Sequence, residues 1–91
     1  MIVLGRISAP FGIRGWVKLQ VFGDDPLAWA HMPQWWLAAD EQGPEGKWQA
    51  RQLAECRVHG KGLIVRFEGF EDRNAAENLA GLYVGAPREA L

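Results

Sequence analysis

The chain has 91 residues, of which 48% are hydrophobic and 23% are charged. This length accommodates one domain, and the composition is too apolar for a disordered segment. Ten Lys and Arg against eleven Asp and Glu give a formal net charge of −1, which excludes a strong whole-molecule attraction to nucleic acid.

The N-terminal part of the chain alternates apolar and polar side chains with the period of two that is typical of β-strands. A first strand is predicted over residues 2–9, ending at Pro10, and a second over residues 16–22. Between them, residues 11–15 contain two glycines that can adopt positive φ, so this segment is predicted to be a loop.

The middle of the chain begins with a predicted break and a short helical turn. Asp25 is the expected N-cap of a turn over residues 27–32, with Pro26 at the first helical position. A third strand is predicted over residues 34–39, and the turn-forming residues 40–46 indicate an exposed connection.

A hairpin is predicted next, because the alternation of residues 48–58 is followed by a Gly-Lys-Gly turn and a further strand over residues 63–68. One phase of the first hairpin strand is mainly apolar and is expected to face the core. It consists of Trp48, Ala50, Ala54, Cys56 and Val58, with Gln52 as the exception.

A single convincing helix is predicted near the C-terminus, with Asp72 as N-cap, residues 73–80 as its body and Gly81 as its end. A last strand follows over residues 82–84. The expected fold is therefore an all-β, six-stranded closed antiparallel barrel with one short helix, because closure removes the exposed edges of many short strands. We expect residues 1–86 to form this domain and residues 87–91 to begin a linker.

The reactive side chains do not form a recognisable catalytic or metal-binding pattern. The chain has no Thr and a single Ser, Ser8, and its one cysteine, Cys56, is expected to be a small buried hydrophobe. His31 and His59 are 28 positions apart without clustered ligands. We therefore expect no enzymatic activity, no metal and no cofactor. A lone cysteine and a start without a signal peptide or membrane span predict a cytoplasmic protein with no membrane partner. We also expect the protein to be a monomer.

The loop of residues 11–15 is the sharpest local feature. Gly12-Ile13-Arg14-Gly15 matches the G-x-x-G pattern of nucleic-acid-binding KH modules, although in KH modules that loop joins two helices. Two interpretations stay open: Phe11 and Ile13 plug an end of the barrel, or Arg14 is displayed to a partner.

Three further features concern surfaces. Trp35 and Trp36 are neighbours, so only one can face the core; the other either packs beneath the turn over residues 27–32 or marks a partner site. The charge is divided into blocks: residues 1–23 carry three cations and no acid, whereas residues 24–46 carry five acids and no Lys or Arg. A basic patch across the hairpin is the last candidate, formed by Arg51, Arg57, Lys61 and Arg66.

Two segments resemble the signatures of the RimM family of ribosome maturation factors. The first combines residues 3–7, VLGRI, with residues 11–17, FGIRGWV; the second is residues 67–81, FEGFEDRNAAENLAG. Both occur in the family's order and together span most of the chain.

The resemblance implies a non-enzymatic factor that assists late maturation of the small ribosomal subunit, chiefly its head, and the processing of its rRNA. It implies a first barrel related to those of translation elongation factors, followed by a second barrel beyond this chain. The implied partners are the small-subunit head protein numbered nineteen and the immature small subunit, with an rRNA contact in addition. The family's motifs fall on Arg6, Phe11, Gly12, Ile13, Arg14 and Gly15, which are the candidate partner-binding residues. Two alternatives are a sequence-tolerant RNA-binding barrel and a flavin-binding barrel of the reductase type.

Overall fold

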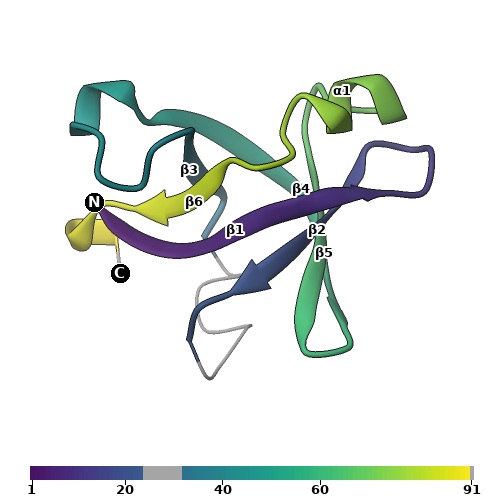
Figure 1. Cartoon of the computed structure of the whole chain (residues 1–91), viewed down its shortest axis with the longest axis horizontal. Coiled ribbons are helices and arrows are strands. Elements are labelled where there is room, and N and C mark those ends of the chain that lie inside the picture. Colours follow the sequence, from purple (N-terminus) through teal and green to yellow (C-terminus); the bar gives the residue numbers. More distant parts are fainter. Residues whose placement is uncertain (24–31, 91) are drawn as a thin grey trace.

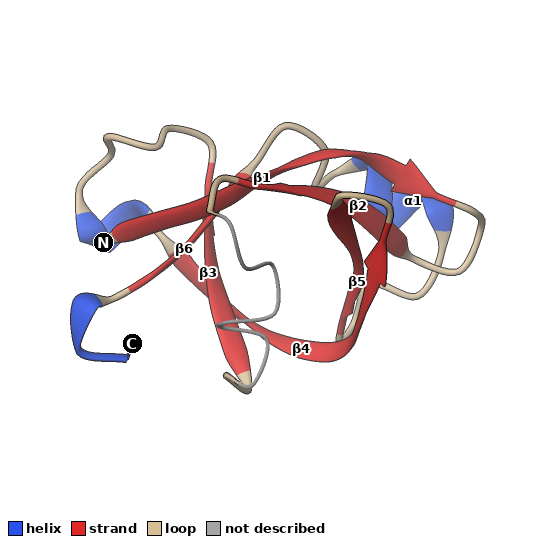
Figure 2. Cartoon of the chain, turned by 90° about the horizontal axis from the view of Figure 1, so that it is seen from below, coloured by secondary structure: helices blue, strands red, loops and turns tan. Residues whose placement is uncertain are grey.

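In the computed structural model, which describes residues 1–23 and 32–90, six antiparallel strands close into a ring (Figures 1 and 2). Around the ring the order is β1-β2-β5-β4-β3-β6, and β6 returns to β1. This arrangement confirms the predicted closed barrel. The strands are β1 (Ile2–Phe11), β2 (Trp16–Val21), β3 (Gln34–Ala38), β4 (Gln49–His59), β5 (Gly62–Phe67) and β6 (Tyr83–Ala86).

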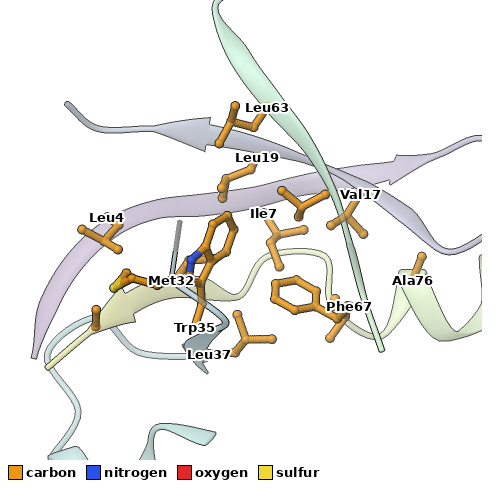
Figure 3. Packing of buried hydrophobic residues seen from close by; sticks show 14 residues of the cluster. Leu4, Ile7, Val17, Leu19, Met32, Trp35, Leu37, Leu63, Phe67 and Ala76 are labelled. Atoms are coloured by element: carbon orange, nitrogen blue, oxygen red, sulfur yellow. The ribbon is translucent and has the colours of Figure 1, made fainter. Parts of the chain in front are cut away.

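The barrel interior is filled by the apolar phase of each strand. Seven large side chains are almost completely buried (Figure 3): Ile7, Val17, Trp35, Leu63, Val65, Phe67 and Val84. Trp35 and Phe67 meet edge to face, with ring centroids 6.0 Å apart. Trp35 is therefore the indole that faces the core, while Trp36 is half-buried and packs against the core cluster. The turn beneath which the second indole was predicted to pack lies outside the described residues except for Met32.

Strand β1 contains two irregularities that bend it around the barrel. An extra residue lies between Val3 and Gly5 relative to β6, and another between Ile7 and Ala9 relative to β2. Bulges of this kind increase the local twist and allow a short sheet to close. Pro10 continues the strand by pairing with Val17, beyond the predicted end. Since β6 pairs with β1 only as far as Arg6, the missing N–H of Pro10 costs no ladder bond on that side.

A third irregularity lies in β4 and makes the prediction of its inward-facing residues wrong for part of the strand. An extra residue between Leu53 and Glu55 shifts the register, so Leu53 pairs with the buried Phe67 whereas Cys56 pairs with the buried Val65. Odd-numbered residues of β4 therefore face the core before the bulge, and even-numbered residues face it after the bulge. Ala50 was expected inside and is exposed, and Val58, at the far end of the strand, is 54% exposed.

The helix α1 (Arg73–Glu77) is shorter than predicted but begins where expected. The Asp72 side chain accepts a hydrogen bond from the Ala75 N–H at 2.8 Å, which confirms the N-cap. After Glu77 the chain tightens, since Leu79 and Ala80 donate to carbonyls three residues back rather than four. Gly81, at φ 88°, then turns the chain into β6.

Two short 3₁₀ helices complete the described elements: η1 (Glu45–Lys47) in the β3–β4 connection and η2 (Arg88–Ala90) after β6. The predicted cap at Asp25 and the turn over residues 27–32 lie outside the described residues except for Met32, which is buried. No helix within the described residues is long and apolar enough to span a membrane.

Candidate functional site

The β1–β2 loop owes its shape to its two glycines. Gly12 and Gly15 have φ values of 73° and 89°, which side chains with a β-carbon rarely adopt. Around Gly15 there is no space for a side chain, because an added β-carbon would lie 1.9 Å from the carbonyl oxygen of Phe70. The loop therefore rests directly on the segment that leads into α1.

A side chain of α1 holds the same loop from its other end. The Arg73 guanidinium donates from Nη1 to the Gly12 carbonyl at 3.2 Å, and its Nε bonds Glu77 at 3.2 Å. The two conspicuous sequence segments, 11–17 and 67–81, are thus one structural unit, and the loop backbone is fixed at both glycines.

The tip of the loop faces solvent. Ile13 is 74% exposed, which excludes the interpretation that it plugs the barrel. Arg14 is also exposed, and within residues 1–23 and 32–90 it forms no hydrogen bond or ion pair. An exposed isoleucine beside an uncommitted arginine on a fixed backbone is a suitable contact point for another macromolecule.

Phe11 is half-buried and packs on the outside of the barrel rather than in its end. Its ring meets the His59 ring edge to face with centroids 4.9 Å apart, and the Lys18 ammonium lies 5.7 Å from its centroid. Lys18 and His59 are both exposed, so this small cluster belongs to the outer surface of β2 and β4.

Next to Phe11, the outer surface is hollowed. The hollow has a volume of about 550 Å³ and combines apolar, cationic and acidic side chains. Its lining residues are Phe11, Arg14, Trp16, Glu55, Arg57, Ile64, Arg66 and Glu71.

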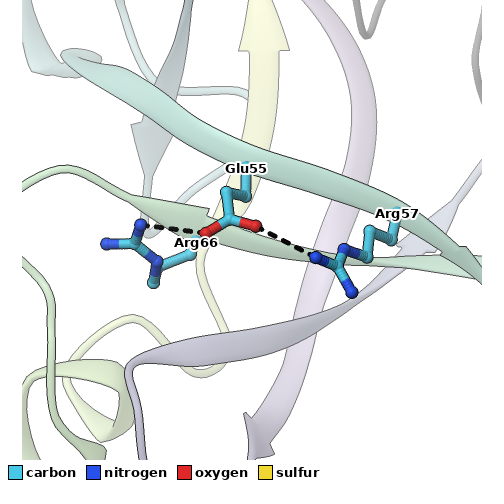
Figure 4. A network of polar contacts seen from close by, with 3 residues as sticks. All are labelled: Glu55, Arg57 and Arg66. Atoms are coloured by element: carbon cyan, nitrogen blue, oxygen red, sulfur yellow. Dashed lines mark hydrogen bonds and ion pairs between the residues drawn. The ribbon is translucent and has the colours of Figure 1, made fainter.

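One carboxylate organises the cations of this hollow (Figure 4). Glu55 lies between two guanidiniums and accepts from Arg66 at 3.1 Å and from Arg57 at 3.4 Å. Arg57 also covers the Trp16 ring at 5.4 Å from its centroid. The predicted basic patch is thus correct for Arg57 and Arg66. Arg51 is separate, because its guanidinium lies over Phe70 on the border of a different hollow.

Arg6 is not brought to this hollow. Its Nε donates to the Gly81 carbonyl at 3.3 Å, and its guanidinium lies 5.2 Å from the Tyr83 ring centroid. These contacts anchor β1 to the turn that precedes β6, so Arg6 has a structural position in this barrel.

The single cysteine is a poor nucleophile in this structure. Cys56 is partly buried against the core, and this burial raises the pKa of its thiol. Among the described residues no three His, Cys, Asp or Glu side chains are grouped in a way that could hold a metal ion. His31 lies outside the described residues.

Four residues of the hollow were not predicted as site residues: Trp16, Glu55, Ile64 and Glu71. The first three lie in the outward phase of strands β2, β4 and β5, and only the strand order places them together. The one available signal in the sequence was polar alternation, which every solvated strand face shares.

Comparison with known proteins gives a consistent result. The model of the RimM N-terminal domain matches residues 2–91. Ribosome maturation factor RimM of Aromatoleum aromaticum is 63% identical over 91 residues, and that of Azoarcus sp. strain BH72 is 60% identical. Each comparison covers 100% of this chain and 54% of the relative, so the chain spans about half the length of these curated relatives.

Solved structures agree with the fold. The 16S ribosomal RNA processing protein RimM of Pseudomonas aeruginosa superposes with a TM-score of 0.79 at 32% identity, covering 99% of this chain and 52% of that one. The solution structure of the N-terminal domain of RimM from Thermus thermophilus gives a TM-score of 0.72 at 27% identity, covering 99% of this chain and 92% of that one.

Proposed function

The chain belongs to the RimM family, and from that premise we propose that it is a non-enzymatic binding module that docks a ribosome maturation factor onto the immature small subunit. The family supports a role in ribosome maturation. The proposed partner on the particle is the small-subunit head protein numbered nineteen, and the proposed compartment is the cytoplasm.

The loop tip carries this proposal. Ile13 is 74% exposed on a backbone fixed by Gly12 and Gly15, and Arg14 beside it has no hydrogen-bond or ion-pair partner among the described residues. A docked partner would bury the isoleucine and supply a carboxylate for the guanidinium, whose planar fork can donate hydrogen bonds to two oxygens at once. Because the loop is already ordered, little conformational entropy is lost on docking.

Phe11, Gly12 and Gly15 each support the tip through a contact, and Gly15 does so by lying against the Phe70 carbonyl. Phe11 fixes the start of the loop against His59 and Lys18, and Gly12 accepts from Arg73. In this proposal Arg6 acts indirectly, by holding β1 through the Gly81 carbonyl. Residues 1–86 form the docking barrel, and residues 87–91 begin a connection to a second domain.

The test uses small-subunit precursor particles from cells that lack the factor. The full-length factor is compared with its Arg14→Ala and Ile13→Ser variants by cosedimentation, and Arg88→Ala serves as a charge control. Arg88 is exposed in η2, which lies beside the chain's N-terminus and away from the β1–β2 loop (Figure 1).

We expect each loop variant to weaken particle binding about tenfold or more, as contact residues at the centre of an interface do, and Arg88→Ala to leave it unchanged. A titration of the 91-residue chain with head protein nineteen, followed by NMR, should move the resonances of residues 11–15. Unchanged particle binding by both loop variants would show that the loop is not the docking site.

A further inference from the structure

The geometry points to a second contact: the outer surface of β2, β5 and β4 binds single-stranded RNA through the hollow bordered by Trp16, Arg57 and Arg66. This inference rests on the proposed function, because the ribosomal particle is where such RNA would be met. Apart from Arg14, which borders the hollow, it concerns different residues from the loop tip, and its test uses none of the loop-tip variants.

The hollow has the two chemical components that an unpaired nucleotide requires. Trp16 with the Arg57 guanidinium 5.4 Å from its centroid offers planar surfaces, and bases stack on both indole rings and guanidinium planes. Arg57 and Arg66 each contribute one hydrogen bond to Glu55, which leaves further N–H donors on both for phosphate oxygens. The volume of about 550 Å³ is sufficient for one nucleotide.

A second hollow continues the path along the same surface. It has a volume of about 380 Å³ and is lined in part by Lys18, His59 and Lys61. The two hollows adjoin where Phe11 of the first contacts His59 of the second, with ring centroids 4.9 Å apart. A strand of RNA could therefore place successive nucleotides on either side of the Phe11–His59 pair.

The surface is positively charged although the chain is not. Five cations line the two hollows, Arg14, Lys18, Arg57, Lys61 and Arg66, against two carboxylates, Glu55 and Glu71, which gives +3 with His59 neutral. The whole chain carries −1. Strand pairing produces this concentration, since β2 from the basic block of residues 1–23 pairs with β5, the hairpin strand that carries Arg66.

An acidic peptide would satisfy the same cations but would not use the aromatic surfaces. Trp16, Phe11 and His59 alternate with Lys18, Arg57 and Arg66, and this interleaving is what stacked bases joined by phosphates require. RNA is therefore the occupant that uses both the cations and the aromatic rings of the surface.

The experiment is a fluorescence-anisotropy titration of the 91-residue chain with a labelled single-stranded RNA of mixed sequence, at several salt concentrations. The variants are Arg57→Gln and Trp16→Leu, and Arg88→Gln is the matched charge control. Arg57 is 69% exposed at its side chain, so its replacement leaves the fold intact even if Trp16→Leu unfolds in a thermal melt.

The two variants should change different properties of RNA binding. Arg57→Gln should weaken binding and reduce the slope of log affinity against log salt by about 0.7, the loss of one phosphate contact on a single strand. Trp16→Leu should weaken binding about fivefold or more with the slope unchanged, because stacking releases no counterions. Arg88→Gln should change neither quantity.

The inference is overturned if the wild-type chain fails to bind the RNA at low salt, if Arg57→Gln and Arg88→Gln behave alike, or if a poly-glutamate peptide binds while RNA does not. Failure here leaves the docking proposal intact, since that proposal is tested with whole particles and with Ile13 and Arg14 variants.

Discussion

Gly15 lies so close to the carbonyl oxygen of Phe70 that a β-carbon on Gly15 would be 1.9 Å from it. The two residues belong to different segments of the chain, one between β1 and β2 and the other just before α1. Their contact explains why a glycine-rich loop and an acidic helix cap act together: the helix segment is the support on which the loop is built.

Replacing Gly15 by alanine should be far more costly than the same change at Gly12. Both have positive φ, but only Gly15 also meets backbone, whereas a β-carbon at Gly12 would enter open space. We expect Gly15→Ala to lower the free energy of unfolding by about 2–4 kcal/mol and Gly12→Ala by about 1–2 kcal/mol. Urea unfolding of the two variants measures the difference. Equal losses would contradict the close contact.

Removing the N-cap of α1 should destabilise the barrel moderately. The Asp72 carboxylate accepts from the Ala75 N–H at 2.8 Å, and an alanine there would leave that donor without its partner. Asp72→Ala should cost about 1 kcal/mol, while Asp72→Asn, which keeps an oxygen acceptor, should cost only a few tenths. Thermal denaturation monitored by circular dichroism would compare them, and similar losses would argue against the cap.

The adjacent indoles should respond differently to the same truncation. Trp35 is fully buried against Phe67, so Trp35→Phe opens a cavity in the core and should lower the free energy of unfolding by about 1–3 kcal/mol. Trp36 is half-buried, and Trp36→Phe should cost less than about 1 kcal/mol. Chemical denaturation of both variants provides the comparison, and a larger loss at Trp36 would reverse the assignment.

Sequence reasoning predicted the six strands because their apolar residues alternate, and that pattern is local. It failed in β4, where the bulge between Leu53 and Glu55 moves the inward phase from odd to even positions. Gln52 was the sequence signal of this bulge, because it is a polar residue among the positions predicted to face the core and lies next to Leu53. A bulge is stabilised by closure of the ring, which depends on strands far apart in the chain.

The candidate site was predictable in its loop and, through the predicted hairpin, in Arg57 and Arg66. Gly12, Ile13, Arg14 and Gly15 are consecutive, so their glycine spacing could be recognised directly. The hollow beside them needs β5 between β2 and β4, a non-sequential order that places Trp16, Arg57 and Arg66 on one surface. For the same reason the sequence did not indicate that the cations of residues 1–23 lie beside those of the hairpin.

Cys56 should react slowly with alkylating reagents. Burial raises the pKa of its thiol, so at pH 8 the native chain holds less of the reactive thiolate than an ordinary cysteine does. The raised pKa also affects the free energy of unfolding. Between the ordinary thiol pKa and the raised one, the unfolded state binds fewer protons than the native state, so the free energy of unfolding should fall as the pH rises through this interval. Iodoacetamide alkylation followed by mass spectrometry, with the urea-unfolded chain as the fast control, measures the first effect. Equal rates in the two states would contradict it.

Arg73 should act as a positioning residue for the loop rather than as a contact. Its Nη1 donates to the Gly12 carbonyl at 3.2 Å, while its Nε bonds Glu77 on the same helix. Arg73→Gln removes both interactions, whereas Glu77→Gln weakens only the exposed ion pair and keeps the bond to the loop. Since one hydrogen bond contributes about 0.5–1.5 kcal/mol, Arg73→Gln should weaken binding to small-subunit precursors about 2- to 10-fold and lower the ¹⁵N order parameters of residues 12–15. Glu77→Gln should leave both near wild type, because exposed pairs of this spacing stabilise a helix only slightly. If the two variants gave the same loop dynamics, the Gly12 bond would have no part in ordering the loop, and the fixed tip would have to depend on Gly15 and Phe70 alone.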